Sequence, residues 1–437
     1  MRSLRPGAPA AARPGRVLIV IQNMSYHFDR RVQNEAQALL GAGIGVTVVC
    51  PKATPQEPDL HDVAGVLVRS YPALGATSGV GSYVREFLLA WLMASRLSWR
   101  AHRAEGFDVI QACNPPDTYW ALAVLWKVLG KKFVFDQHDL NPEVFVDRFG
   151  RTSLRDRAIH RVLLGLERAT YAVADHVVVP NESYRDVATG RGGVPREKTT
   201  VVMSTPDHRK MCKGEGRADA RAGFQHLVAY VGVMGPQDGV DRLIRTARLL
   251  KDKGRTDTRF VLMGFGDCRA DLQTLTTTLG LDDCVHFTGR VGQDELRAWL
   301  SAADVGVTPD ALSDFTDRST MNKTLEYMAC ELPVVASDLL ETRRSAGDAA
   351  VYVRSEAEMA AAIDHLLQDS EQRALMGKVG RERIVGQLTW DRFAVDYVAA
   401  VSRVLGRPVS RVIPSFRVPR PRQAAADMAV MPWSPVS

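Results

Sequence analysis

The sequence predicts an α/β protein built from two tandem domains, each a doubly wound parallel sheet covered by helices. Three observations predict this class: short β-branched runs alternate with helical patterns, the alternation restarts near residue 205, and glycine-rich turns follow several predicted strands. Alternation of this kind favours parallel sheets, because parallel neighbours need a crossover connection that is usually a helix. The 437 residues are 46% hydrophobic and 24% charged, which is enough apolar material for two cores.

The strands predicted in the first half are apolar throughout, as expected for parallel strands covered on both faces. Val17–Ile21 is the first of them, and an apolar stripe at helical spacing from Val32 to Leu40 follows and ends at glycine. Further strands are predicted at Val46–Cys50, Val109–Ile110, Phe133–Phe135 and Val177–Val179, with helices at about 82–104, 118–129 and 153–175.

The same rhythm restarts in the second half of the chain, which predicts a first domain at 16–205 and a second at 206–389. The predicted strands are Val228–Val231, Phe260–Met263, Val285–Phe287, Val305–Val307 and Val334–Ala336, with helices at about 240–250, 293–303 and 323–331. A last helical pattern occupies 390–406. Residues 1–15 and 407–437 are rich in Arg, Pro and Ala without periodicity and are predicted to be disordered.

Charge and cysteine content exclude several classes of protein. The net charge is +6, but the two terminal extensions hold nine arginines and one acid, which leaves −2 for residues 17–406 and no basic groove for nucleic acid. The six cysteines are widely spaced with no Cys-x-x-Cys pair, so we expect reduced thiols and no metal site. No apolar run is long enough for a membrane span or a signal peptide, so the expected location is cytoplasmic.

Glycine turns mark the candidate binding edge of the second domain. They occur at Gly232 and Gly235, at Gly264 and Gly266, and at Gly289, next to Arg290. Ligands of open α/β sheets bind outside the carboxyl ends of the strands, where such turns let a backbone approach. One such turn is usually only a tight connection, but several at one edge favour a nucleotide-type ligand.

The segment from Ser319 to Ala329 adds side chains to this edge. Lys323 falls in the first turn of a predicted helix, where a cation is unfavourable unless an anion binds there too. A phosphate would satisfy both, and Glu326, one turn later, is placed to accept hydrogen bonds from sugar or ribose hydroxyls. The alternative is a surface ion pair between Lys323 and Glu326, which are three residues apart.

The first domain offers two polar segments after predicted strands. His138 and Asp139 end an apolar strand, and the histidine is either a hydrogen-bonding or acid/base group or a structural residue. The loop after the first strand carries His27, Arg30 and Arg31, whose charges suit either an anionic ligand or a solvated helix end.

Over residues 16–405 the chain resembles glycosyltransferase family 4, which has the GT-B fold of two Rossmann-like domains, in its bacterial cell-surface polysaccharide branch. The resemblance is carried by seven segments: Val17–Arg31, FDQHDLNPE at 135–143, VPNESYRD at 179–186, YVGVMGPQDGVD at 230–241, VLMGFGD at 261–267 and VHFTGRV at 285–291, and NKTLEYMACELPVVAS at 322–337. The last helix, TWDRFAVDYVAAV, resembles the helix that crosses back to the first domain in this family.

The resemblance implies retaining transfer of a sugar, of hexosyl or N-acetylhexosaminyl type, from a nucleotide diphosphate sugar, with uridine as the expected base. The second domain would bind this donor, and the first domain would bind a glycan or lipid-linked acceptor. Glu326 corresponds to the second motif glutamate, expected at the donor ribose, and His138 lies where the family contacts the transferred sugar. No metal or other cofactor and no catalytic nucleophile are implied.

Three positions depart from the family pattern. Arg318 replaces the first motif glutamate, and Val233 and Asp238 replace the usual Arg and Lys of the first glycine turn. Two expected diphosphate cations are therefore missing. Lys323, with Asn322, is the predicted substitute, and Arg318 and Arg290 are further candidates.

These assignments leave two other functions open. A nucleotide-sugar 2-epimerase has the same architecture, and the three departures favour a non-catalytic binding subunit. The predicted helix at 82–104 combines Phe87, Leu88 and Trp91 with several arginines, so it either rests on an anionic membrane surface or packs in the core with a solvated basic edge. Membrane contact would make the protein peripheral on the inner face of the plasma membrane.

Overall fold

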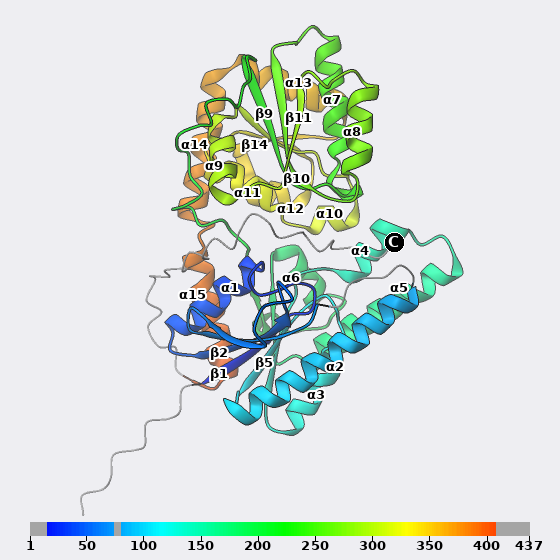
Figure 1. The fold of residues 1–437 in the computed structure, drawn as a ribbon, viewed down its shortest axis with the longest axis vertical. Coiled ribbons are helices and arrows are strands. Elements are labelled where there is room, and N and C mark those ends of the chain that lie inside the picture. Colours follow the sequence, from blue (N-terminus) through cyan, green and yellow to red (C-terminus); the bar gives the residue numbers. More distant parts are fainter. Residues whose placement is uncertain (1–14, 74–79, 408–437) are drawn as a thin grey trace, which may run out of the picture.

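The computed structural model describes residues 15–73 and 80–407, which form two α/β units stacked along the long axis of the molecule (Figure 1). The disorder predicted for residues 1–15 and 407–437 falls outside the described residues, except for Gly15 and Arg407. Among the described helices, none has both the length and the hydropathy that crossing a bilayer requires.

An eight-stranded sheet forms the first unit, in the order β3-β4-β2-β1-β5-β6-β7-β8. Its strands are β1 (Arg16–Val20), β2 (Gly45–Pro51), β3 (Leu60–Val63), β4 (Val66–Tyr71), β5 (Val109–Cys113), β6 (Lys132–Asp136), β7 (His176–Val179) and β8 (Thr199–Val201). The helices are α1 (Arg30–Gly41), α2 (Val80–Ala104), α3 (Trp120–Val128), α4 (Asn141–Phe149), α5 (Leu154–Val173) and α6 (Glu182–Thr189). Strand β1 is central, with Val17 paired to Val46 of β2 and to Val109 of β5, and its apolar side chains are fully buried.

Six parallel strands form the sheet of the second unit, in the order β11-β10-β9-β12-β13-β14. They are β9 (His226–Val233), β10 (Thr258–Phe265), β11 (Val285–Gly289), β12 (Val305–Thr308), β13 (Val334–Ser337) and β14 (Ala350–Val353). The helices are α7 (Val240–Asp252), α8 (Arg269–Thr278), α9 (Gln293–Ala302), α10 (Asp314–Arg318), α11 (Asn322–Ala329), α12 (Leu340–Ala346), α13 (Glu356–Gln368) and α14 (Ser370–Gly386).

The predicted fold class is confirmed, with one exception to the all-parallel expectation. Strand β3 pairs antiparallel with β4 at the edge of the first sheet. Its residues alternate between exposed and half-buried, so it lacks the continuous apolar run that marks a buried parallel strand. Strand β3 has no counterpart among the predicted elements, and neither do the parallel strands β4, β8 and β14.

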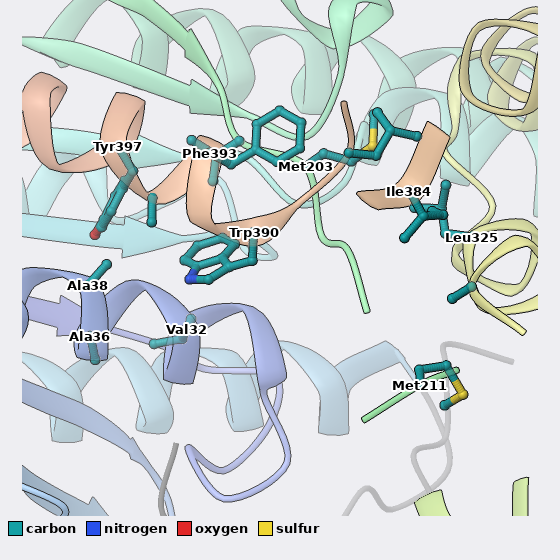
Figure 2. Close-up of a cluster of buried hydrophobic side chains, with 14 of the residues drawn as sticks. Val32, Ala36, Ala38, Met203, Met211, Leu325, Ile384, Trp390, Phe393 and Tyr397 are labelled. Carbon is teal, nitrogen blue, oxygen red and sulfur yellow. The ribbon is translucent and has the colours of Figure 1, made fainter. Parts of the chain in front are cut away.

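The C-terminal helix α15 (Trp390–Val404) leaves the second unit and packs on the first, beside α1 (Figure 1). Trp390, Phe393 and Tyr397 are buried along it, and the Tyr397 hydroxyl donates a 2.7 Å hydrogen bond to Gln111 Oε1 of β5. These side chains belong to one apolar cluster that includes Val32 of α1 and Leu325 of α11 (Figure 2). The crossover helix predicted at 390–406 thus joins the two units through shared core.

Candidate functional site

The carboxyl ends of β9 and β10 carry three of the predicted glycines, and the structure gives a packing reason for each. Gly232, Gly264 and Gly266 have φ values of 153°, 153° and 156°. A Cβ on Gly264 would lie 1.8 Å from the Gly232 carbonyl oxygen, and one on Gly266 would lie 2.6 Å from the Met234 backbone. The two turns therefore touch backbone to backbone, which only glycine permits.

The two other predicted glycines have different surroundings. A Cβ on Gly235 would meet the Gln237 side chain, which is flexible. Gly289 has φ 75° and open space around it, with Arg269 Nη1 the one atom found within 4.0 Å. Its positive φ favours glycine, and a side chain at this position would meet open space among the described residues.

Arg290 spans the two units. Its guanidinium lies 5.3 Å from the ring centroid of Phe265, at the end of β10, and 5.9 Å from that of Phe28, in the loop after β1. The residue is exposed, and no carboxylate of the described residues pairs with it. A cation held between two aromatic rings without an anionic partner is available to a negatively charged ligand.

Arg269 is a site candidate that the sequence prediction missed. It is the first residue of α8, follows the Gly264–Gly266 turn, and lies nearest to the open space at Gly289. Its Nε is buried without a hydrogen-bond partner, and no described carboxylate forms an ion pair with it. A cation in the first turn of a helix is unfavourable without an anion, so its sequence position after a glycine turn was the signal.

Lys323 does not face an open anion site, which corrects the interpretation of its place in α11. Its side chain is 8% exposed, and its ammonium donates to Asp310 Oδ1 at 2.6 Å and to Asp238 Oδ1 at 3.3 Å. Burial opposes its charge, but these carboxylates and Tyr230 raise the pKa of Lys323 well above its ordinary value. Two buried acids therefore already neutralise the cation that we expected at the donor diphosphate.

Glu326 lies where the two units meet. Its side chain is 9% exposed, and Arg30 of α1 donates to Glu326 Oε1 at 3.4 Å from both terminal nitrogens. Burial raises the pKa of Glu326, and Arg30 opposes that rise. Glu326 contacts Arg30 rather than Lys323, so the alternative of a Lys323–Glu326 surface pair is wrong.

Arg31 and His138 belong to a buried charge network under the edge of the first sheet. Arg31 donates to Asp136 Oδ1 at 2.7 Å, lies 3.2 Å from Glu35 Oε1 and also donates to the Val202 carbonyl. His138 Nε2 is 2.7 Å from Asp136 Oδ2. Arg31 is thus occupied by carboxylates of its own domain, which corrects the expectation that its charge faces an anionic ligand or solvent at the helix start.

The network fixes the charge state of His138. Burial opposes protonation, but the Asp136 carboxylate outweighs it and raises the pKa of His138 to about 9. Against burial, Arg31 and His138 in turn hold the pKa of Asp136 well below its usual range. At neutral pH His138 is therefore an imidazolium, which donates hydrogen bonds but does not accept a proton as a general base.

This pair predicts a pH dependence of stability. Because the folded pKa of His138 lies above its unfolded value of about 6.5, its contribution is complete below pH 6.5 and is lost as the pH rises through about 9. Urea unfolding should show wild type losing about 3 kcal/mol more than His138→Gln between pH 6.5 and 9.5. Parallel profiles for the two proteins would contradict the pairing.

The remaining predicted residues lie at the contact between the units or beside it. The Asn181 side chain of the first unit donates to the Arg318 carbonyl at 2.8 Å, which places Arg318 at the contact between the units. The guanidinium of Arg318 has no ion pair among the described residues. Asn322 is exposed at the start of α11. Asp139 lies two residues before α4, which contacts α10 of the second unit, and burial raises the pKa of Asp139. His27 lies instead beside His61 and Glu57, on the loop that also carries Phe28.

Two clusters of described residues have donor types that metal ions use. In the first, Cys113 and His138 surround Asp136, whose oxygens already bind Arg31 and His138, so that cluster is a charge network rather than a cation site. The second comprises His27, Glu57 and His61 and lies outside this network.

Comparisons with known proteins show that both α/β units resemble glycosyltransferase domains. Residues 29–204 match the family model described as Glycosyl transferase 4-like domain, and residues 225–369 match the model described as Glycosyl transferases group 1. Alpha-D-kanosaminyltransferase of Streptomyces kanamyceticus is 25% identical over 370 residues, which span 80% of this chain and 92% of that protein. The 2-deoxystreptamine glucosyltransferase of the same organism is 25% identical over 338 residues, or 73% of this chain and 83% of that protein.

Solved structures share the fold. Sucrose-phosphate synthase from Thermosynechococcus elongatus superposes with a TM-score of 0.71 at 20% identity, over 90% of this chain and 99% of that one. Anabaena Alr3699/HepE, solved in complex with UDP-glucose, has a TM-score of 0.65 at 16% identity, over 89% and 99% of the two chains.

Proposed function

We propose that this chain, which is a glycosyltransferase with the GT-B fold, transfers a sugar from a nucleotide diphosphate sugar to a glycan or lipid-linked acceptor with retention of configuration. The observation that carries the proposal is that Arg269, Arg290 and Arg318 of the second domain form no ion pair with a carboxylate among the described residues, and that the first two of them flank the Gly289 turn. A diphosphate would supply the negatively charged partner that these three side chains lack among the described residues.

The arginines also suit the chemistry of the leaving group. Breaking the bond between sugar and diphosphate develops negative charge on the phosphate oxygens, and fixed cations in a partly dry site stabilise that charge. Arg290 and Arg269 flank the Gly289 turn, where space is open. We assign this charge neutralisation to them in place of Lys323, whose ammonium is held by Asp310 and Asp238.

Glu326 and His138 are assigned to the carbohydrate. A buried carboxylate that accepts two 3.4 Å hydrogen bonds from Arg30 on Oε1 retains acceptor capacity for ribose or sugar hydroxyls. The imidazolium of His138 has its Nε2 on Asp136, which leaves its Nδ1 proton for a hydroxyl of the transferred sugar. Neither group acts as a nucleophile in this proposal, and no metal takes part in the transfer.

The proposed base of the donor and the proposed acceptor are taken from similar proteins. Uridine is favoured by a structural neighbour solved with UDP-glucose. Guanosine is the alternative, because a GDP-mannose-dependent mannosyltransferase of Mycobacterium tuberculosis is 31% identical over 191 residues, or 42% of this chain. A cell-surface glycan product is supported by the amylovoran biosynthesis glycosyltransferase AmsK of Erwinia amylovora, 33% identical over 112 residues, or 25% of this chain.

Contact with a membrane surface, in the cytoplasm, is part of the same proposal. Leu88 and Leu92 of α2 are 58% and 57% exposed, Val128 of α3 is 81% exposed, and Arg103 lies over the ring of Trp99. Apolar side chains mixed with arginine suit an anionic lipid surface carrying the acceptor. It stays a prediction.

A thermal-shift panel tests the proposal. One nucleotide diphosphate sugar, with UDP-sugars ranked first, is expected to stabilise the protein by about 2.7 kcal/mol at a hundred times its Kd. The corresponding nucleoside monophosphate, which lacks the second phosphate, should stabilise less. The absence of a shift with every UDP-, GDP-, ADP- and dTDP-sugar would contradict donor binding.

The same ligand separates the rival functions. A transferase releases nucleoside diphosphate slowly by hydrolysis without acceptor, an epimerase inverts C2 of the sugar, and a binding subunit does neither. Val233 and Asp238, in place of two expected cations, are the observations that favour the binding subunit. Slow hydrolysis under excess enzyme is the expected result.

A further inference from the structure

Three side chains outside the proposed transfer site bring metal-ligand atoms together on the first domain. His27 lies in the loop after β1, Glu57 lies between β2 and β3, and His61 lies in β3. The Nε2 atoms of His27 and His61 are 3.4 Å apart. Glu57 Oε1 lies 3.6 Å from His27 Nε2 and 3.3 Å from His61 Nε2. Neighbouring ligands of a tetrahedral zinc ion, bound at about 2.0–2.1 Å, stand about 3.3–3.4 Å apart.

From this triangle we infer that His27, Glu57 and His61 form a binding site for a divalent transition metal ion, with zinc as the fitting ion. Two imidazole nitrogens and one carboxylate oxygen are a common ligand set for zinc, and the fourth position is left to water. Harder ions such as Mg²⁺ prefer an all-oxygen set and are not expected here.

The state of Glu57 is a second, independent indication of a ligand. Its side chain is 7% exposed, and its Oε1 is buried with no hydrogen-bond partner. The two Nε2 atoms, 3.4 Å apart, and Glu57 Oε1 face one another across a space that an ion bound to all three could occupy. A cation between the three atoms satisfies all of them.

Backbone groups hydrogen-bond to the atoms of His61 and Glu57 that do not face the site, and so orient these two ligands. His61 Nδ1 lies 3.2 Å from the Pro58 carbonyl, so its proton belongs on Nδ1 and its Nε2 lone pair faces the site. The Ala53 amide donates to the other oxygen of Glu57. The two imidazole rings are stacked, with 8° between their planes, and their Nε2 atoms lie 3.4 Å apart.

The location suggests what the ion does. The loop that carries His27 also carries Phe28, whose ring lies against Arg290, and Asp29, which caps α1 just before Arg30. A metal bound to His61 and Glu57 would tie this loop to the edge of the sheet and hold Phe28 and Arg30 toward the second domain. None of the three ligand residues is assigned to the donor, so metal binding and donor binding are measured separately and either can fail without the other.

Metal titration of the full chain, without a histidine tag and stripped with chelator, tests the site. Calorimetry with zinc chloride is expected to show one equivalent bound with a Kd below about 1 µM. His27→Ala, His61→Ala and Glu57→Gln should each weaken binding at least about 100-fold. His160→Ala, which removes a histidine of α5 far from this triad in sequence, is the matched control and should bind as wild type does.

Two results would overturn the inference. The first is that the wild-type chain binds no zinc ion with a Kd below about 1 µM, and the second is that each of the three variants still binds one zinc ion as tightly as the wild type. A variant with metal-free melting temperature below that of the metal-free wild type is set aside for misfolding. Crystals of the wild type soaked in zinc then decide, since an anomalous peak must lie between the three ligand atoms, and a peak elsewhere alone contradicts the site. Zinc should also slow deuterium exchange over residues 22–29.

Discussion

Replacing Glu326 by glutamine is expected to lower kcat/KM for sugar transfer by about 10- to 100-fold, because a hydrogen bond to a charged acceptor contributes about 1.5–3 kcal/mol. Glutamine keeps the shape of the side chain but removes the charge that the donor hydroxyls would meet. Stability should change little, since the partner Arg30 is 68% exposed and such pairs contribute about 0–1 kcal/mol.

Glu382→Gln is the matched control for this substitution. Glu382 lies on α14, its side chain is 67% exposed, and it forms an ion pair with Lys378 on the same helix. It should retain wild-type kinetics. Steady-state kinetics with the donor from the thermal-shift panel provides the measurement, and unchanged kcat/KM in Glu326→Gln would contradict the assigned role.

Replacing Lys323 by methionine is expected to destabilise the second domain by about 3–5 kcal/mol, because it leaves Asp310 and Asp238 buried without their cation. Asp310 is 2% exposed and Asp238 14%, so water does not compensate them. Urea unfolding measures the loss. The double variant Lys323→Met with Asp310→Asn should recover part of it, since one of the orphaned charges is then gone.

One finding would restore a direct role for Lys323 at the donor phosphate. The position of Lys323 in the first turn of α11 predicts at least a tenfold loss of turnover on removal. If Lys323→Met folds with wild-type stability and still loses that turnover, its ammonium moves from the carboxylates to the donor. If stability falls as expected, Lys323 holds the Gly232 turn in place, where a Cβ would lie 3.4 Å from its Cε.

The fold could be predicted from the sequence because its strongest signals are local. The apolar run at Val17–Ile21 and the stripe that follows predict β1 and α1, and Gly264 and Gly266 predict a turn at the end of β10. Strand β3 is an edge strand with alternating exposure, so its signal depends on a neighbour that the sequence does not show.

The candidate site was harder, because the partners of its charged residues are distant in the chain. Arg31 pairs with Asp136, 105 residues away, and Lys323 with Asp238, 85 residues away. In the sequence, a cationic side chain at the start of a helix appears without a partner, so it is predicted to bind an anionic ligand. In the fold, a buried carboxylate from a distant part of the chain pairs with it. Arg269 carried the same local signal as Lys323, and among the residues that the structure describes no carboxylate pairs with Arg269.

A crystal structure with the nucleotide diphosphate sugar that stabilises the protein most tests the central claim most directly. We expect the diphosphate within hydrogen-bonding distance of Arg290 or Arg269, beside the Gly289 turn, and a donor hydroxyl on Glu326. A nucleotide bound on the first domain, or one whose phosphates meet none of Arg269, Arg290 and Arg318, would contradict it.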